Sequence, residues 1–392
     1  MAFAEKVDSY FGITAKGSNM KTEVKGGILV FLSMVYIIAV NSGMMVVAGI
    51  PYEEAYSATI IMAIIGSLLM GLYAKFPVAM APGMGINAMF CYTAVLSLGF
   101  TWQEALVAVV IAGLGFFIVT VSGVRQKLLD KIPHALKASI IAGIGAFIAF
   151  IGLQNAGIIT DSSTLVGLGD LSDPLVLLGF FCIVITLFLV ARGNSLGVLI
   201  GMIATAVLGI VTGYIPLPSE IFSMPEAPPF GAFLDGISSD LVSVKFIAIV
   251  ITFAFVEFFD GSGTLMAVGK RAGFTDQDDN VTCGTALQVD AGIASLSGVI
   301  GCTPTTAFAE SAVGAEAGAR TGLVPVIVAI LFGFSLFIAP LFQIVGYQCT
   351  VGAMFIVGVA MMAELKDVDW SDWPSLVAVI STMVMMLLTY SI

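Results

Sequence analysis

Apolar windows long enough to cross a lipid bilayer follow one another along this chain from residue 26 to its C-terminus. A helix of about 20 mostly apolar residues spans roughly 30 Å of hydrocarbon. Only 10% of the 392 residues are charged and 59% are hydrophobic, whereas a soluble domain has about 25% charged residues. The pattern therefore predicts an all-α polytopic membrane protein and excludes a large soluble domain.

Polar, Gly and Pro breaks divide the chain into thirteen candidate spans, seven before and six after a long polar connection. The first seven are expected at residues 26–48, 57–72, 80–98, 105–121, 134–156, 174–191 and 196–214. The other six are expected at residues 244–266, 281–302, 304–317, 322–345, 351–362 and 374–392.

The basic residues orient these spans, because cytoplasmic ends of membrane proteins are rich in Lys and Arg. With a cytoplasmic N-terminus, fourteen of the fifteen Lys and Arg residues fall on the cytoplasmic side, and Lys245 falls outside. The fourteen are Lys6, Lys16, Lys21, Lys25, Lys75, Arg125, Lys127, Lys131, Lys137, Arg192, Lys270, Arg271, Arg320 and Lys366. Residues 1–25 lack the apolar core of a secretory signal, so we expect a cytoplasmic N-terminal segment and a multi-pass protein of the inner or plasma membrane.

The two halves of the chain resemble each other weakly but in the same order. Segments that begin at Val24 and Val244 both open with Val-Lys and close with Ser-Gly. "MAPGMGINAMF" and "CTPTTAFAESA" align at Pro82 and Pro304, which are 222 residues apart, and "DLSDP" returns as "DWSDWP". An odd number of spans separates the partners, so the second copy must be inverted in the membrane. The second copy lacks a counterpart of the span at 196–214, and we expect the protein to continue past residue 392 with that span.

Four acidic side chains lie well inside predicted spans of the second half: Glu257, Asp260, Asp290 and Glu310. An acid at the centre of a membrane helix costs roughly 2.5 to 3.5 kcal/mol on insertion scales, so such groups face a cavity or a partner. Asp260 precedes Gly and Ser residues in "EFFDGSGTL", which permit close approach of a backbone or a substrate. Glu257 is open to a packing or a functional role, and Asp290 is expected to hold the scaffold together.

A proline interrupts each of the repeat-related segments that carry Asn87 and Glu310. Pro82 and Pro304 follow small or polar residues, a pattern that predicts a helix starting at mid-membrane after extended chain. Free N–H groups at two facing helix starts would offer hydrogen-bond donors to a ligand in a central cavity.

Two phenylalanines, Phe90 and Phe308, lie close in sequence to Asn87 and Glu310. Aromatic rings beside polar groups can stack on a flat ligand. The chain contains 28 phenylalanines, so their position near the polar groups is what singles these two out.

Signals of other classes of protein are missing from the sequence. The five cysteines are single, with no CxxC pair, which argues against a disulfide framework and a metal site. The chain has no Walker A or HExxH pattern, and its one histidine, His134, lies at the edge of a span. We therefore expect no cofactor, no metal and no nucleic-acid partner, and the sequence does not favour an enzyme.

Three motifs together, "APGMGINAMF", "EFFDGSGTLMAVGKRAG" and "GCTPTTAFAESAVGAEAGARTGL", resemble the nucleobase/ascorbate transporter superfamily, in its AzgA-like purine permease branch. The resemblance implies a 7+7 inverted-repeat transporter fold with fourteen spans, of which thirteen are present here. It also implies a core domain, a gate domain and two broken helices that carry short strands. Cys302 and Pro304 stand where relatives often have small hydroxyl residues.

The resemblance divides the chain into two inverted repeats. The first is expected at 26–215, with core spans at 26–122 and gate spans at 134–215. An extracellular loop follows at 216–243. The second repeat is expected at 244–392, with core spans at 244–345 and gate spans at 346–392.

Carried over by position, the resemblance implies that Asp260 and Glu310 contact a base, that Asn87 lines the site, and that Phe308 and Ala309 present ring and backbone to the ligand. Members of the branch couple uptake of guanine, hypoxanthine or adenine to protons.

We therefore expect a secondary active importer of purine nucleobases that works by proton symport, with elevator-like movement of core against gate. Glu310, Asp260 and Glu257 are the candidates for proton coupling. The expected partners are the base, the proton and the lipid bilayer, with a second copy of the chain in a homodimer as a further candidate. An anion transporter of the same architecture is one alternative, which the two acids and the lack of Lys or Arg at the site disfavour. A membrane-embedded enzyme is a weaker alternative.

Overall fold

The computed structural model describes residues 2–123, 125, 134–163, 165–218, 220–275 and 281–389. Several sequence-based expectations lie outside the described residues. These concern Lys127, Lys131 and the last three residues of the final span.

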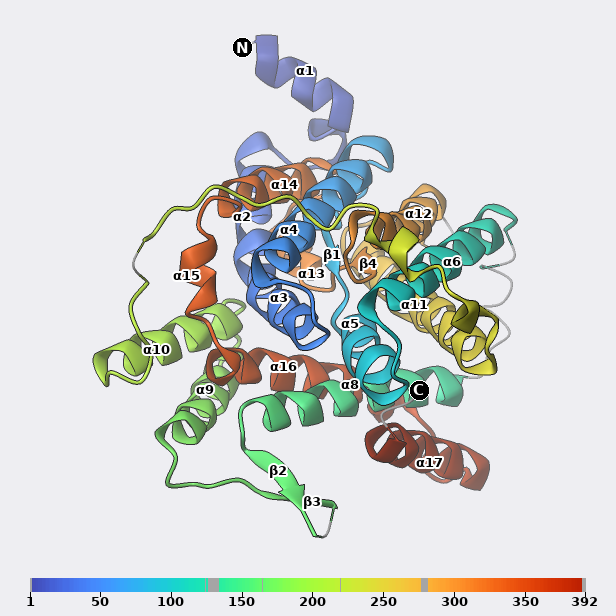
Figure 1. The fold of residues 1–392 in the computed structure, drawn as a ribbon. Coiled ribbons are helices and arrows are strands. Elements are labelled where there is room, and N and C mark those ends of the chain that lie inside the picture. The colour runs from blue at the N-terminus through green and yellow to red at the C-terminus, as the bar shows by residue number, and fades with distance from the viewer. Residues whose placement is uncertain are drawn as a thin grey trace.

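The first half of the chain folds into helices, one short strand of the interior and a peripheral hairpin (Figure 1). The elements between residues 2 and 121 are α1 Ala2–Phe11, η1 Thr14–Lys16, α2 Met20–Met34, α3 Ile37–Val47, α4 Tyr52–Leu68, η2 Leu69–Tyr73, β1 Met80–Pro82, α5 Met84–Ala88, η3 Met89–Ser97 and α6 Trp102–Val121. They are followed by α8 His134–Asn155, β2 Ile159–Ser162, β3 Leu165–Leu168, α9 Pro174–Ala191 and α10 Gly197–Val211. β2 and β3 form the antiparallel hairpin.

The second half repeats this pattern of helices around one short strand. Its elements are η4 Ala232–Gly236, η5 Ser239–Val242, α11 Val244–Arg271, α12 Gly284–Ile300, β4 Thr305–Ala307, α13 Ser311–Glu316, α14 Leu323–Ser335, α15 Ala339–Gln343, α16 Tyr347–Met362, η6 Ala363–Asp367 and α17 Trp373–Thr389. Each of the thirteen predicted spans contains a helical segment among the described residues, and those at 80–98 and 304–317 begin with the strands β1 and β4. Among the described residues, six helical stretches are long and apolar enough to cross a membrane on their own.

Side-chain caps explain where several of these helices begin. Thr101 accepts a hydrogen bond from the N–H of Glu104, and the Glu104 carboxylate accepts one from the N–H of Thr101. This reciprocal pair satisfies backbone donors that the first turn of α6 leaves open. Asp173 caps α9, whose first residue is Pro174, and Ser243 caps α11. Each cap stands at a boundary that the hydrophobic pattern predicts to within a few residues.

The first span begins earlier than predicted. α2 starts at Met20 rather than at residue 26, with Asn19 as its cap. Glu23 is fully buried and accepts hydrogen bonds from the backbone N–H groups of Arg320 and Thr321. Part of the segment predicted to be a cytoplasmic tail is therefore packed inside the protein, because a distant loop supplies the partners for its acid.

The helices form two packed groups (Figure 1). In one group, α2, α4 and α14 pack together, and α6 packs on α11 and α12. In the other group, α8 packs on α16 and α17, and α9 packs on α10 and α16. Gly145 of α8 and Gly358 of α16 bring two backbones close, since a Cβ on Gly358 would lie 2.4 Å from the Gly145 carbonyl oxygen. Small residues permit such close packing of helices in a membrane.

The described part of the connection at 216–243 lies along the first group of helices. Figure 1 shows it running from α10 past α14 and α4 to α12 and α6. Three bonds fasten it: Ser223 N–H donates to the Phe337 carbonyl at 3.0 Å, Gly231 N–H to the Val299 carbonyl at 2.8 Å, and Ser238 Oγ to Glu104 Oε1 at 2.6 Å. The connection is therefore attached to this helix group along most of its length.

Candidate functional site

The two segments that the repeat aligns meet in the middle of the protein as paired strands. β1 and β4 run antiparallel, with Pro82 opposite Thr305 and Met80 opposite Ala307. The pairing extends past both strands, because Gly83 N–H donates to the Pro304 carbonyl and Phe308 N–H donates to the Ala79 carbonyl, both at 2.9 Å. The two broken segments thus satisfy part of each other's backbone groups, and side chains such as Ser67 and Ser297 bond others, as a membrane interior requires.

The prediction that Pro304 starts a helix is wrong. Pro304 precedes strand β4, and the helix α13 begins only at Ser311. Pro82 likewise lies in β1, and α5 begins at Met84. Proline lacks an N–H group and fits extended chain at the start or edge of a strand as well as it fits the first turn of a helix.

Gly83, at the turn from β1 into α5, brings a second helix close to the strands. A Cβ on Gly83 would lie 2.7 Å from Cγ2 of Thr306 and 3.4 Å from Oδ2 of Asp260. Only a residue without a side chain leaves room for both neighbours. The carboxylate of Asp260 on α11 therefore faces the β1–α5 turn, as a shared binding site requires.

Glu310 occupies the turn between β4 and α13, where it accepts a hydrogen bond from the hydroxyl of Tyr36. Tyr36 lies where the first span breaks between α2 and α3, and only 1% of it is exposed. The sequence-based site did not include Tyr36. A tyrosine inside an apolar span needs a partner for its hydroxyl, and that signal could have singled it out.

Phe308 and Ala309 lie between β4 and Glu310. The Phe308 side chain is buried, whereas Ala309 is exposed. The N–H of Ala309 donates to no other group among the described residues. A free backbone donor thus lies one residue before Glu310 in the chain.

Two other predicted residues, Asn87 and Phe90, are enclosed by protein. Asn87 on α5 is fully buried, and neither atom of its amide has a hydrogen-bond partner in the described part of the chain. Phe90 is also fully buried and stacks on Phe253 of α11, with ring centroids 6.5 Å apart. Both residues therefore lie beneath the site, and neither presents an exposed surface to it in this state.

Glu257 is buried on α11, and its two carboxylate oxygens have no hydrogen-bond partner among the residues described. It borders a cavity of about 10 Å³ that Pro304, Ala294 and Phe253 help to line. This volume is close to the minimum that one water molecule needs.

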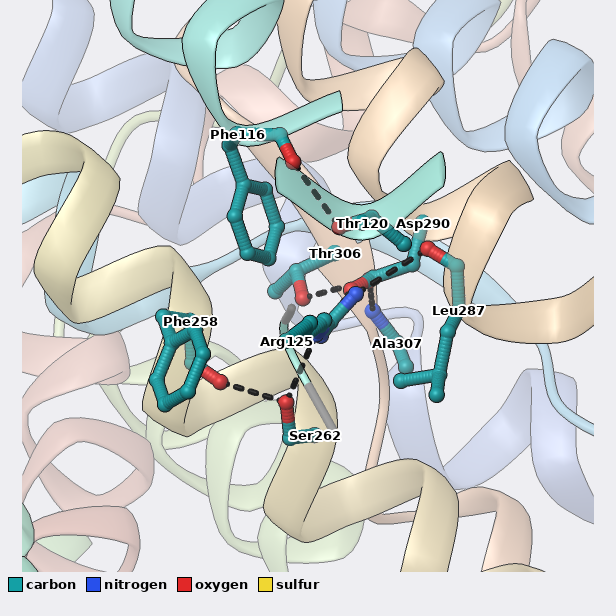
Figure 2. Close-up of polar contacts among 9 residues, drawn as sticks. All are labelled: Phe116, Thr120, Arg125, Phe258, Ser262, Leu287, Asp290, Thr306 and Ala307. Atoms are coloured by element: carbon teal, nitrogen blue, oxygen red, sulfur yellow. Dashed lines mark hydrogen bonds and ion pairs between the residues drawn. The ribbon is translucent and has the colours of Figure 1, made fainter. Parts of the chain in front are cut away.

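Asp290 holds the scaffold together, as its sequence context predicts. Its Oδ1 accepts hydrogen bonds from the Thr306 hydroxyl at 3.0 Å and from the Ala307 N–H at 3.2 Å. Its Oδ2 accepts from the guanidinium of Arg125 at 3.0 Å (Figure 2). Sequence reasoning missed Arg125, since the charge rule counts it with the solvated cytoplasmic residues.

The acids of this region outnumber the cations that neutralise them. Asp260 lies within electrostatic reach of Asp290 and Glu310. In the described ranges no ion pair joins Asp260, Glu310 or Glu257 to a Lys or Arg, whereas Asp290 is paired with Arg125. The arrangement can therefore accept hydrogen bonds from a ligand and can bind protons, while Ala309 supplies a donor.

Long apolar helices packed in two groups, with two broken segments meeting at a polar centre, define a membrane transporter built from two repeats. The same fold is found in the transmembrane domain of the cyanobacterial bicarbonate transporter BicA, with a TM-score of 0.73 and 14% identity over 94% of this chain and 97% of that one. This likeness confirms the predicted fold class.

The chain belongs to the permease family Xan_ur_permease, whose model matches residues 21–392. The guanine/hypoxanthine permease PbuG of Bacillus subtilis is 39% identical over 98% of this chain and 90% of its own length. The adenine permease AdeQ of Escherichia coli is 36% identical over 97% of this chain and 86% of its own length. The predicted family is thereby confirmed, and the chain is a transport protein of the membrane rather than an enzyme.

Proposed function

We propose that this protein imports purine nucleobases together with protons. The observation that carries the proposal is that Asp260 lies beside the β1–α5 turn and within electrostatic reach of Glu310, which follows the paired strands together with the free N–H of Ala309. Relatives that align with nearly the whole chain are named guanine/hypoxanthine and adenine permeases, which supports this choice of substrate.

The chemistry of the site suits a flat, neutral base. A purine carries both N–H donors and ring acceptors, so its site needs directional hydrogen bonds and apolar surface rather than a counter-charge. Glu310 and Asp260 can accept from ring N–H groups, and Ala309 can donate to a ring nitrogen or carbonyl oxygen. Phe308 is the nearest aromatic ring in the sequence and would cover one face of the base.

Uncompensated acids support coupling to protons. An ionised carboxylate is costly in apolar surroundings unless it is paired and hydrogen-bonded. Glu257 has neither an ion-pair partner nor a hydrogen bond among the described residues, and Asp260 has other acids as its charged neighbours. Proton binding relieves this repulsion, so base and proton together stabilise the loaded site. Binding that is coupled in this way yields symport.

We further propose that transport proceeds by movement of a core against a gate. The core comprises the spans at 26–122 and 244–345, and the gate comprises those at 134–215 and 346–392. The separate packing of α8, α9, α10, α16 and α17 supports this division. Where the groups touch, Gly85 of α5 faces Ile144 of α8, and a Cβ on Gly85 would lie 2.7 Å from Ile144 Cγ2. Small residues at such a contact favour sliding over interlocking.

We place the N-terminus in the cytoplasm and the protein in the plasma membrane, where a homodimer is the assembly we propose. Basic groups near α1 support this orientation. Lys75 Nζ donates to the Tyr10 carbonyl at 3.1 Å, and Lys16 lies over the ring of Phe274 at 4.1 Å. Lysines from distant segments thus gather at one end of the protein, as the excess of cytoplasmic charge predicts.

An anion carrier is the second candidate, since the solved neighbour BicA is a bicarbonate transporter. Low identity to that protein supports the shared fold alone. Arg125 is the one buried cation near the candidate site in the described part of the chain, and Asp290 already neutralises it. An anion would therefore meet carboxylates without a counter-charge.

The test is uptake of radiolabelled guanine, hypoxanthine, adenine and uracil into cells that lack their own purine permeases, with and without a proton uncoupler. We expect saturable uptake of at least one purine and its loss with the uncoupler. Glu310→Gln and Asp260→Asn should abolish uptake while the protein stays in the membrane. Glu316→Gln, at an acid that is 63% exposed on α13, is the matched control and should transport normally.

Each part of the proposal has its own contrary result. Purine uptake that ignores the uncoupler removes proton coupling. Normal uptake by both Glu310→Gln and Asp260→Asn refutes the site. Uptake of none of the purines refutes the substrate class.

A further inference from the structure

Arg125 is an almost fully buried guanidinium, with 1% of its surface exposed. It follows α6 in the connection that leads toward α8. Its planar group makes three hydrogen bonds in three directions: Nε donates to Ser262 Oγ at 2.9 Å, Nη1 to the Leu287 carbonyl at 3.0 Å and Nη2 to Asp290 Oδ2 at 3.0 Å. Its carbon also lies 4.4 Å from the ring centroid of Phe116.

These bonds join the helices on either side of the site. Figure 2 shows Arg125 between Ser262 of α11 and Asp290 of α12, and Thr306 and Ala307 of β4 beside the Asp290 carboxylate. Ser262 lies two residues after Asp260, and Ala307 directly precedes Phe308. The Arg125 side chain therefore links α11, which carries Asp260, through Asp290 to β4, the strand that precedes Glu310.

The space around this contact leaves little room for adjustment. A Cβ on Gly261 would lie 2.2 Å from Asp290 Oδ2, so α11 packs directly against the carboxylate that Arg125 binds. Ser262 in turn donates to the Phe258 carbonyl at 2.5 Å. The position of Asp290, and with it the position of β4, thus depends on the partner that holds its second oxygen.

We propose that Arg125 is a positioning residue, which fixes β4 against α11 so that Glu310 and Asp260 meet the transported base at the correct separation. The inference rests on the proposed function, since it concerns the binding of that base. Arginine suits the task because its rigid fork reaches three acceptors at once, which the single ammonium group of lysine cannot reproduce.

The structure also explains why a charge is required. Asp290 accepts two bonds from β4 and is fully buried. Without a cation beside it, its carboxylate would be an unpaired buried charge, which is strongly destabilising. Such a site relaxes by moving or protonating the carboxylate, and either change releases the hydrogen bonds that hold Thr306 and Ala307.

The experiment compares the uptake kinetics of Arg125→Gln and Arg125→Lys with those of the wild-type chain, using radiolabelled guanine, hypoxanthine and adenine. The amount of protein in the membrane is measured for each variant. We expect Arg125→Gln to raise KM by about tenfold while Vmax per molecule stays within about twofold, since residues joined in one hydrogen-bond network are energetically coupled. Arg125→Lys should raise KM less, because it keeps the charge and loses the fork.

Two controls separate positioning from general damage. Arg271→Gln removes a surface arginine whose ion pair with Glu316 has the same 3.0 Å length but is mostly exposed, and it should leave KM unchanged. The double variant Arg125→Gln with Asp290→Asn should have a KM no higher than Arg125→Gln alone, because the two side chains act through one contact.

A wild-type KM in Arg125→Gln would overturn the inference and leave the proposed function intact. If Arg125→Gln does not reach the membrane, Arg125→Lys decides: a raised KM supports positioning, and a wild-type KM overturns it. Absence of both variants from the membrane overturns it as well, because the role would then be one of folding. A wild-type chain that takes up none of the three bases overturns the proposed function, and the inference falls with it.

Discussion

The hydrogen bond from Tyr36 to Glu310 gives a direct test of how the binding acid is held. Tyr36→Phe removes one oxygen atom and keeps the ring that fills the break between α2 and α3. The Tyr36 hydroxyl is the one side-chain donor that the described residues direct at Glu310. After the change, the carboxylate is free to rotate away from the position in which it would meet a base.

The size of the effect follows from the type of bond that is lost. A hydrogen bond to a charged group contributes about 1.5 to 3 kcal/mol. If this hydrogen bond serves to orient Glu310 for the ligand, removing the Tyr36 hydroxyl should raise KM for the transported purine by about 10- to 150-fold. Folding should be less affected, because the ring remains and Glu310 is only partly buried.

Radiolabelled purine uptake at a series of substrate concentrations measures this change. Tyr56→Phe is the matched control, since Tyr56 is equally buried and its hydroxyl donates to the Ser335 carbonyl at 2.5 Å rather than to an acid of the site. The control should keep the wild-type KM. An unchanged or lower KM in Tyr36→Phe would refute the reasoning, because the hydroxyl would then be idle or in competition with the base.

Three further predictions concern packing, charge and pH. Gly145→Val should lower the free energy of unfolding by about 1 to 3 kcal/mol, visible as a lower Tm in detergent, because a Cβ there lies 2.6 Å from the Gly358 carbonyl oxygen; an unchanged Tm would contradict the close contact of α8 and α16. Arg271→Gln should change the free energy of unfolding by less than about 1 kcal/mol, since its ion pair is exposed, and a larger drop in Tm would show a buried role. Hydrogen bonds from the Thr14 N–H and hydroxyl lower the pKa of Asp8 from its ordinary value of 3.8. The bonds should therefore persist above pH 3.8 and be lost as the pH falls below it, when the carboxylate takes up a proton. Proteolytic cleavage after α1 should increase over that fall in pH in the wild-type protein and stay constant in Asp8→Asn.

The order and number of spans could be predicted because each apolar window carries its own signal. The alignment of Pro82 with Pro304 also predicted which two segments correspond, and the structure pairs them residue by residue. The predicted start of the second broken helix, at Pro304, was wrong. A proline indicates that a regular helix is interrupted, but it does not determine how many residues of extended chain follow. That length depends on the partner strand, which is 222 residues away in the sequence.

Contacts across the fold account for what the sequence did not reveal. Arg125 looks like one of many basic residues in a loop, and its burial depends on Asp290, 165 residues later in the chain. Tyr36 lies in a span with no Pro at the break between α2 and α3, so the sequence shows that its hydroxyl needs a partner but does not show that the helix breaks there or that the partner is Glu310. Acidic residues were easier to identify, because a carboxylate in an apolar window is conspicuous whatever surrounds it.

The strand pair at the centre also bears on how such a chain can be made. β1 belongs to the first repeat; Ser67 of the same repeat bonds the backbone of Met80, whereas the strand that pairs with β1 is β4 of the second repeat. During synthesis the backbone groups of β1 that bond β4 remain unpaired until residue 307 has left the ribosome and entered the bilayer, where an unpaired peptide group costs several kcal/mol. The first repeat therefore cannot finish folding before the second one arrives. A chain made as two separate halves, cut in the connection at 216–243, would have to join within the membrane before β1 and β4 could pair.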